Sequence, residues 1–236
     1  MKKLFSLLFI VTFLISCSKD SSSDSSTPIL SDTPLAKAEY DSSNFGIYKG
    51  IFTGSSGIIT INIKNDGSLN ATMVLDGTTY TFTTTETVAE NQAISSLTFT
   101  SGAMSFDFNT DANGDNPIIN LIVFPEHPNA SFTISKEYSE TLVTCYQGTY
   151  IGDNQGVFNL ILIDGQVYGL SKSNSAENET YFLEGILNLE TNAISSGTID
   201  TNIGTFTGTL SGNTVSGNWS TDAGASTGTW SGTRTL

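Results

Sequence analysis

Apolar and polar residues alternate from about residue 45 to the C-terminus, and turn signals containing Gly, Asn or Asp recur about every ten residues. Such alternation predicts half-buried β-strands, and no segment of this region shows the sustained 3.6-residue period of a helix. In one example, a two-residue turn at Gly212-Asn213 places Phe206 opposite Trp219. One face of this hairpin is then apolar, and the other carries Thr and Ser.

Counting these segments gives about eight strands in each half of the region. Sequential antiparallel strands with short turns and one apolar face favour a small up-and-down barrel or a strongly curled sandwich, because both protect the edges of the sheet. We expect strands to start near Phe45, Ile58, Ser68, Thr78, Ile94, Ala103, Ile118 and Ala130, and again near Tyr146, Val157, Gln166, Thr180, Ile194, Ile203, Thr214 and Thr227. The predicted fold class is all-β, with two tandem antiparallel meander units.

The two halves are related by an internal repeat. Residues 90–98 match residues 190–198 at an offset of one hundred, and both segments contain the run Ala-Ile-Ser-Ser. Further matches in the same order are Tyr48-Lys49-Gly50 with Tyr146-Gln147-Gly148, the turn Asp66-Gly67 with Asp164-Gly165, and Phe106 with Phe206. Matches that keep their order over nearly the whole region indicate two homologous units, which we place at residues 45–136 and 145–236.

The N-terminus has the parts of an export signal. Lys2-Lys3 is followed by an apolar run of about a dozen residues from Leu4 to Ile15, whereas a bilayer span needs about 20. The segment Leu14-Ile15-Ser16-Cys17 closes this run and resembles the lipobox of bacterial lipoproteins. The resemblance implies that residues 1–16 are a signal peptide and that Cys17 becomes the acylated N-terminus. The alternative is an ordinary secretory signal in which this cysteine is incidental.

Residues 17–44 are predicted to form a disordered tether. Ser, Asp and Pro dominate this stretch, so it has too little apolar surface to offset the entropy of ordering. Lys19 and Asp20 in this Ser-rich context resemble the charged tail that directs Bacteroidota lipoproteins to the cell surface. We therefore expect an outer-membrane protein that is anchored by its lipid and exposed at the cell surface.

Charge and cysteine content restrict the partners. The chain has 9 basic and 23 acidic residues, and removal of Lys2-Lys3 with the leader leaves 7 against 23, a formal charge of −16. Nucleic acid and anionic lipid headgroups are therefore poor partners. With Cys17 acylated, Cys145 has no intramolecular disulfide partner. We interpret Cys145 as a small strand residue, because a nucleophilic thiolate needs an electropositive setting.

One segment has the spacing of a calcium loop. Asp111, Asn113 and Asp115 alternate like its oxygen ligands, but Asn116 stands where such loops carry Gly, and Ile122 replaces the bidentate Glu. The same segment aligns with a plain turn in the second unit. An elongated hairpin is the preferred interpretation, and calcium is kept as the alternative; no other cofactor is expected.

Three further side chains are candidates for ligand binding. Trp219 and Trp230 would form a sugar-stacking platform if they share a surface, although Trp219 opposite Phe206 favours a place in the core. Glu184 would be a buried acid if its face of the strand lined a barrel. The opposite face of that strand is the more apolar, so we expect Glu184 to be solvated.

Catalytic residues are not predicted. The single histidine, His127, lies in a proline-bracketed loop. One imidazole cannot make a zinc site, which needs three or four ligands, and a serine triad of the usual type would have to recruit this same histidine. In outline the predicted barrels resemble avidins, lipocalins and surface lipoproteins that bind host proteins. We expect a non-enzymatic binding module that docks to an outer-membrane protein assembly or captures an extracellular ligand. The alternative is a carbohydrate-binding protein or a hydrolase of extracellular polysaccharide, which would need two carboxylates about 5 to 10 Å apart.

Overall fold

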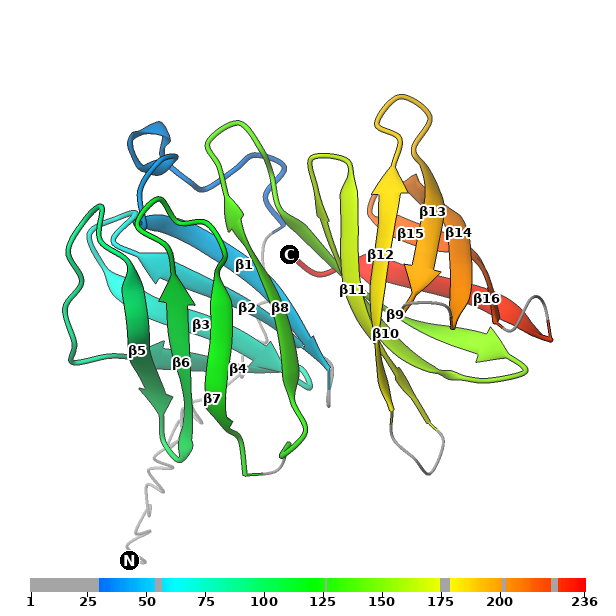
Figure 1. Cartoon of the computed structure of the whole chain (residues 1–236), viewed down its shortest axis with the longest axis horizontal. Helices are drawn as coiled ribbons and strands as arrows, with labels where there is room; N and C mark the ends of the chain where they lie inside the picture. The colour runs from blue at the N-terminus through cyan, green and yellow to red at the C-terminus, as the bar shows by residue number, and fades with distance from the viewer. Residues whose placement is uncertain (1–29, 54–56, 126, 175–178, 201–202, 222–224) are drawn as a thin grey trace, which may run out of the picture.

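The computed structural model describes residues 30–53, 57–125, 127–174, 179–200, 203–221 and 225–236. It consists of two β-units, called unit 1 and unit 2, that stand next to each other (Figure 1). Unit 1 contains β1 (Gly46–Thr53), β2 (Gly57–Ile63), β3 (Leu69–Leu75), β4 (Thr78–Thr83), β5 (Ile94–Ser101), β6 (Met104–Thr110), β7 (Ile118–Val123) and β8 (Ser131–Glu137). Unit 2 contains β9 (Thr144–Gly152), β10 (Gly156–Ile163), β11 (Gln166–Ser173), β12 (Thr180–Leu187), β13 (Ala193–Ile199), β14 (Gly204–Ser211), β15 (Thr214–Thr221) and β16 (Ser226–Arg234).

The prediction of two tandem all-β units is confirmed. The units differ in whether the sheet closes into a barrel. Unit 2 is a closed barrel in the order β10-β11-β12-β13-β14-β15-β16-β9. Unit 1 is a single sheet in the order β7-β6-β5-β4-β3-β2-β1-β8, and its terminal strands β7 and β8 share no ladder among the described residues. A short 3-10 helix, η1 (Ala38–Tyr40), precedes β1. In the part of the chain described here, no helix has both the length and the apolar character that a membrane span requires.

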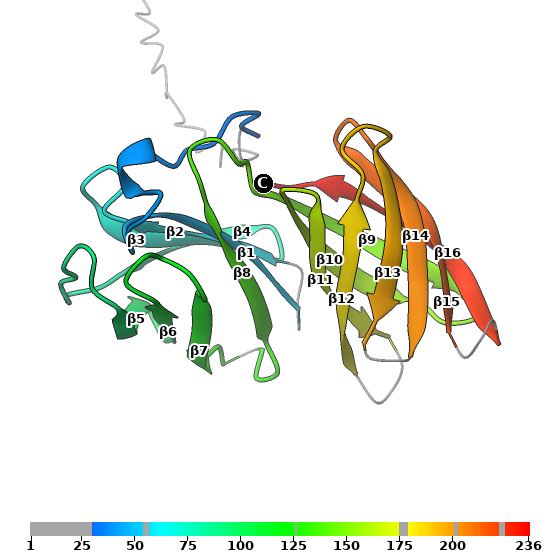
Figure 2. The same cartoon turned by 45° about the horizontal axis from the view of Figure 1, so that its top comes forward.

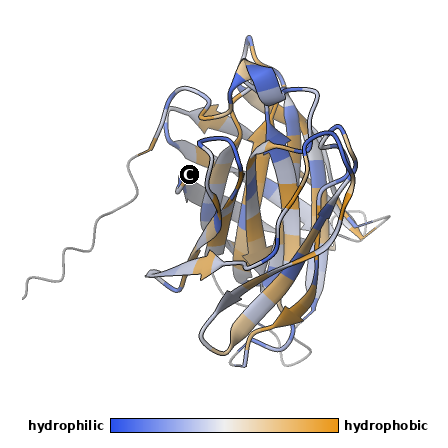
Figure 3. Cartoon of the chain, turned by 90° about the vertical axis from the view of Figure 1, so that its left-hand side faces the viewer, coloured by the Kyte–Doolittle hydropathy of each residue, from blue (hydrophilic) through white to orange (hydrophobic). Residues whose placement is uncertain are grey.

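The strand registers follow the alternation of apolar and polar residues. Phe206 pairs with Trp219 across the β14–β15 hairpin, as the turn at Gly212-Asn213 predicts. Hydrophobic and hydrophilic positions alternate along the strands of unit 1 when it is viewed from its free side (Figure 3). Apolar side chains thus collect inside each unit, because successive residues of a strand point to opposite faces.

The repeat is also visible as a shared irregularity. Ser96 in β5 and Ser196 in β13 both have left-handed backbone, with φ of 57° and 54°, and the strand register shifts at both places. The repeated Ala-Ile-Ser-Ser run is therefore a β-bulge in each unit. One predicted match is wrong: Phe206 corresponds to Phe108 and not to Phe106. The registers show this, because Gly197 pairs with Phe206 where Leu97 pairs with Phe108.

The units pack against each other, with β1 and β8 of unit 1 facing β9, β10 and β11 of unit 2 (Figures 1 and 2). One buried cluster spans the contact and comprises Ile51, Ile58, Val143, Cys145, Ile161 and Leu170. Within it, the side-chain amide of Asn159 donates a hydrogen bond of 2.7 Å to the backbone carbonyl of Phe52. Apolar burial and a buried hydrogen bond thus fix the relative position of the units.

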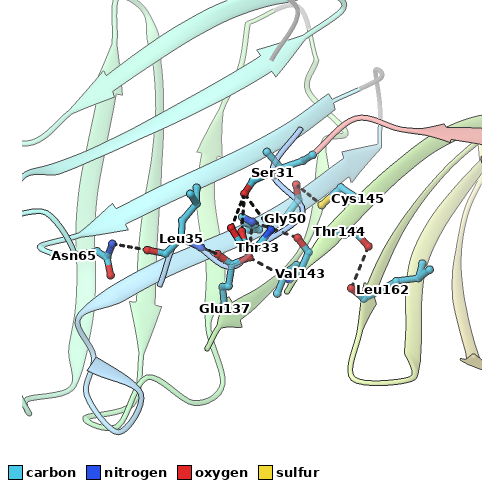
Figure 4. Close-up of polar contacts among 12 residues, drawn as sticks. Ser31, Thr33, Leu35, Gly50, Asn65, Glu137, Val143, Thr144, Cys145 and Leu162 are labelled. Atoms are coloured by element: carbon cyan, nitrogen blue, oxygen red, sulfur yellow. Dashed lines mark hydrogen bonds and ion pairs between the residues drawn. The ribbon is translucent and has the colours of Figure 1, made fainter. Parts of the chain in front are cut away.

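Residues 31–37, called the N-terminal strap, lie across both units (Figure 4). In unit 1, the Leu35 N–H donates to Glu137 at 2.6 Å, and the Leu35 carbonyl accepts from Asn65 at 3.0 Å. In unit 2, the Arg234 guanidinium binds Asp32 at 2.8 Å and the carbonyl of Ser31. This arrangement differs from the disordered tether expected up to residue 44, because polar side chains of both units supply partners for the strap.

A buried ion pair lies beneath the strap. The Lys49 ammonium contacts the Glu137 carboxylate, and the two side chains are 2% and 0% exposed. Glu137 also accepts from the Val143 N–H at 3.1 Å, and Lys49 donates to the Val143 carbonyl at 3.3 Å. The pair therefore joins β1, β8, the strap and the connection between the units.

Candidate ligand-binding cavity

A partly open cavity of about 300 Å³ lies inside unit 2, at one end of the barrel. That end is formed by the last residues of β9, β11, β13 and β15 and by the first residues of β10, β12, β14 and β16. The lining residues are Tyr150, Asn154, Phe158, Leu160, Ser171, Tyr181, Leu183, Ile199, Ile203, Phe206, Thr221, Ser226, Trp219 and Trp230. The cavity thus combines an aromatic and aliphatic wall with a few hydroxyl and amide groups.

Small residues at two strand positions help to explain why this barrel has space. Phe158 pairs with Ser171, whereas the corresponding position in unit 1 is Met73, paired with Ile59. In unit 1 a fully buried methionine therefore fills the space that a serine leaves in unit 2.

The second position is Gly204, which pairs with Ile199. Its counterpart in unit 1 is Phe106, which pairs with Phe99 and is fully buried. The Phe106 ring stacks on Phe99, with centroids 5.3 Å apart, and lies against Phe82 at 5.2 Å. Unit 1 thus has an aromatic core where unit 2 has a hollow end.

Both tryptophans of the chain face the inside of this barrel. Trp219 and Trp230 are 7% and 6% exposed, so they share the interior and do not form a surface platform. A methyl group on Gly228 would lie 2.5 Å from Nε1 of Trp219, and one on Gly208 would lie 2.4 Å from Cζ2 of Trp230. Trp219 therefore rests against a glycine of the adjacent strand β16, and Trp230 reaches across β15 to a glycine of β14. Only a residue without a side chain permits this close approach.

Hydrogen bonds and ring contacts fix the indoles. Trp219 donates its indole N–H to the carbonyl of Ile151 at 3.3 Å, and Trp230 donates to the carbonyl of Thr207 at 3.1 Å. Phe158 and Phe206 meet Trp230 edge-on, at centroid distances of 5.4 and 5.9 Å. Because the indole donors bond to the backbone, the tryptophans offer the cavity mainly apolar ring surface.

The polar groups of the lining are uncharged. Tyr181 donates its hydroxyl to the carboxylate of Glu179. Asn154 accepts from the Gln155 N–H at 2.7 Å, and burial raises the pKa of the Tyr150 phenol. The cavity therefore has groups that can orient a ligand and, among the described lining residues, no Asp, Glu, Lys, Arg or His.

Glu184 lies outside the cavity. It is exposed on the outer face of β12, together with Phe182 and Ile186, whereas Leu183 points into the barrel. The expectation of a solvated Glu184 is confirmed, and a role for it inside the barrel is excluded by its orientation.

The acidic loop between β6 and β7 satisfies its own oxygen atoms. Asn113 donates to the Asp115 carboxylate at 2.6 Å, and Asn116 donates to Asp111 at 2.7 Å. Lys136 approaches the same loop, with its ammonium 3.1 Å from the Asn113 carbonyl. Among the described residues, no group of three or more His, Cys, Asp or Glu side chains is placed to hold a metal. These contacts favour the hairpin interpretation over calcium.

Sequence reasoning missed the second buried lysine of unit 1. Lys136 is 3% exposed, and its ammonium also donates to the carbonyls of Tyr40, Asp41 and Ser43. Burial lowers its pKa, and the charge of nearby Asp41 opposes that shift. Strand alternation gave no signal for this role, because its partners are backbone carbonyls that a side-chain pattern does not reveal.

Cys145 lies in the buried cluster between the units, and His127 lies in the loop between β7 and β8. The Cys145 thiol is fully buried, lies 3.8 Å from the carbonyl of Gly50, and has its pKa raised by burial to about 12. His127 lies in the β7–β8 loop, where its N–H bonds to the carbonyl of Phe124. Cys17, the predicted acylation site, lies outside the described residues.

Comparison with protein-family models, curated proteins and solved structures finds no match for this chain.

Proposed function

We propose that the protein is a lipid-anchored binding protein of the outer membrane, exposed at the cell surface, and that unit 2 binds its ligand. The observation that carries the proposal is the cavity inside unit 2, in a position that Met73 and Phe106 fill in unit 1. Concave, largely apolar sites with a few polar groups are typical of small-molecule binding. Unit 1, which has a filled core, then supports unit 2 structurally and does not itself bind the ligand.

The alternative of a polysaccharide hydrolase has less support. Glycoside hydrolysis needs two carboxyl groups that converge on the scissile bond. The described lining contains no Asp or Glu, and Glu184 faces away from the cavity. The geometry therefore favours binding, either of a free ligand or as part of an outer-membrane assembly.

Filling the cavity tests the binding proposal. Ser171→Met introduces the side chain that unit 1 carries at the same position, and Ser216→Met is the matched control, because Ser216 is exposed on the outer face of β15. Both tryptophans line the cavity, so quenching or enhancement of their emission reports on its contents. We expect small apolar compounds to change the emission of the native protein and of Ser216→Met, but not that of Ser171→Met. Equal responses in all three proteins would contradict the proposal.

The anchor is tested separately. Labelled palmitate supplied to cells should be incorporated into the native chain and not into Cys17→Ala, because acylation needs the thiol. Label in the Cys17→Ala chain, or an intact leader on the native protein by mass spectrometry, would contradict anchoring at this residue.

A further inference from the structure

The charge of the cavity wall restricts the class of ligand. Aromatic rings, aliphatic side chains, hydroxyls and one amide make up the described lining, and none of these groups carries a formal charge. A charged ligand group would lose its hydration on entry, and none of the described lining residues carries a charge that could pair with it. The nearby Glu179 carboxylate lies beside the lining and already accepts a hydrogen bond from Tyr181. The surroundings add to this selection against anions, since the chain carries a net charge of −14 and Glu179 contacts Tyr181 of the lining.

The polar groups collect near the mouth of the cavity. Thr221 and Ser226 are the last pair of the β15–β16 ladder, and Asn154 belongs to the loop after β9. Leu160 and Leu183 lie further along their strands and are buried. A ligand would therefore place its apolar body deep in the barrel and a polar group at the rim.

The volume sets the size of that body. A cavity of about 150 Å³ lined by apolar side chains holds one benzene molecule. The cavity in unit 2, at about 300 Å³, has room for two fused six-membered rings. The ring contacts of Trp230 leave its position fixed, so the wall is shaped before a ligand enters.

We infer that unit 2 binds an uncharged amphiphile, with an apolar body of about two rings inside the barrel and a hydroxyl or amide group at the mouth. This inference rests on the proposed function, because it assumes that the cavity is the binding site. It adds the ligand class: neutral molecules, with acids and amines of the same skeleton excluded.

Three probes with one skeleton test the inference: 2-tetralol, which is neutral, tetralin-2-carboxylate, an anion, and 2-aminotetralin, a cation at neutral pH. Each is titrated into the full-length protein, and the tryptophan emission is excited at the red edge of its absorption, where tetralin does not absorb. We expect the carboxylate and the amine to bind at least about tenfold more weakly than the alcohol. Ser171→Met should abolish the response to all three probes, whereas Ser216→Met should leave it unchanged.

The outcomes separate the two proposals. Tightest binding of the carboxylate or the amine, abolished in Ser171→Met, would overturn the neutral-ligand inference and leave the cavity as a binding site. Absence of binding by all three probes, or binding that Ser171→Met does not alter, would overturn both.

Discussion

Removal of the Lys49 ammonium should destabilise the protein strongly. In Lys49→Met, the Glu137 carboxylate stays fully buried and keeps its bonds to the N–H groups of Leu35 and Val143, but it loses its countercharge. Breaking a buried ion pair from one side costs about 3 to 5 kcal/mol, because the remaining charge is uncompensated. With an m-value of about 3 kcal/mol/M, the midpoint of urea unfolding should fall by about 1 to 1.7 M.

Urea unfolding should be followed by far-UV circular dichroism and by tryptophan emission. Both tryptophans lie in unit 2, whereas Lys49 lies in unit 1. The tryptophan emission therefore shows whether the substitution in unit 1 also lowers the stability of unit 2. Lys37→Met is the control, since Lys37 forms an exposed pair with Glu39 at 3.7 Å and should cost less than about 1 kcal/mol. Lys49→Met/Glu137→Gln should recover part of the loss, because the unpaired charge is removed. The reasoning is refuted if Lys49→Met costs no more than Lys37→Met.

Three further predictions concern single side chains. Asn159→Ala removes the hydrogen bond between the units and should cost about 1 to 3 kcal/mol in urea unfolding; a loss within error of zero would show that this bond does not stabilise the contact. In a Cys17→Ser background, Cys145, with its pKa raised to about 12, should resist a disulfide reagent until urea unfolds the chain, and rapid labelling of the folded protein would contradict its burial. Hydrogen bonds from Ser68 lower the pKa of Asp66 from 3.8 to about 2, so Asp66 stabilises the fold above pH 3.8 and loses this effect as pH falls toward 2. The stability difference between native protein and Asp66→Asn should shrink over that interval, and a constant difference would contradict the assignment.

The strands could be predicted from sequence because their information is local. Alternation and turn residues place each strand start within two residues of its observed position, and they give the pairing of Phe206 with Trp219. The match of Phe106 with Phe206 was wrong because the hairpins differ in length: Leu97 and its partner Phe108 are 11 positions apart, whereas Gly197 and its partner Phe206 are 9 apart. A match that assumes the same offset along the whole hairpin therefore fails in its second strand.

The cavity and the strap could not be predicted because they depend on contacts between distant segments. A serine at position 171 and a glycine at 204 are ordinary strand residues until the register of the barrel shows what they replace. Nor does a Ser- and Pro-rich stretch reveal that Glu137 and Arg234 will bind its backbone. The alternation of apolar and polar residues along a strand determines which face is buried. How completely side chains fill the interior depends on which strands are brought together when the sheet closes into a barrel.

The contact between Arg234 and the strap makes the two ends of the unit 2 barrel different from each other. Arg234 ends β16, whose first residue, Ser226, lines the cavity mouth, and nine residues of strand separate the two poles by about 26 Å. The chain thus enters the fold at the pole opposite to the opening. A solute that diffuses to the opening meets no part of residues 31–37. In the proposed function, the end of unit 2 that leads toward the anchor is therefore opposite to the end that takes up the ligand.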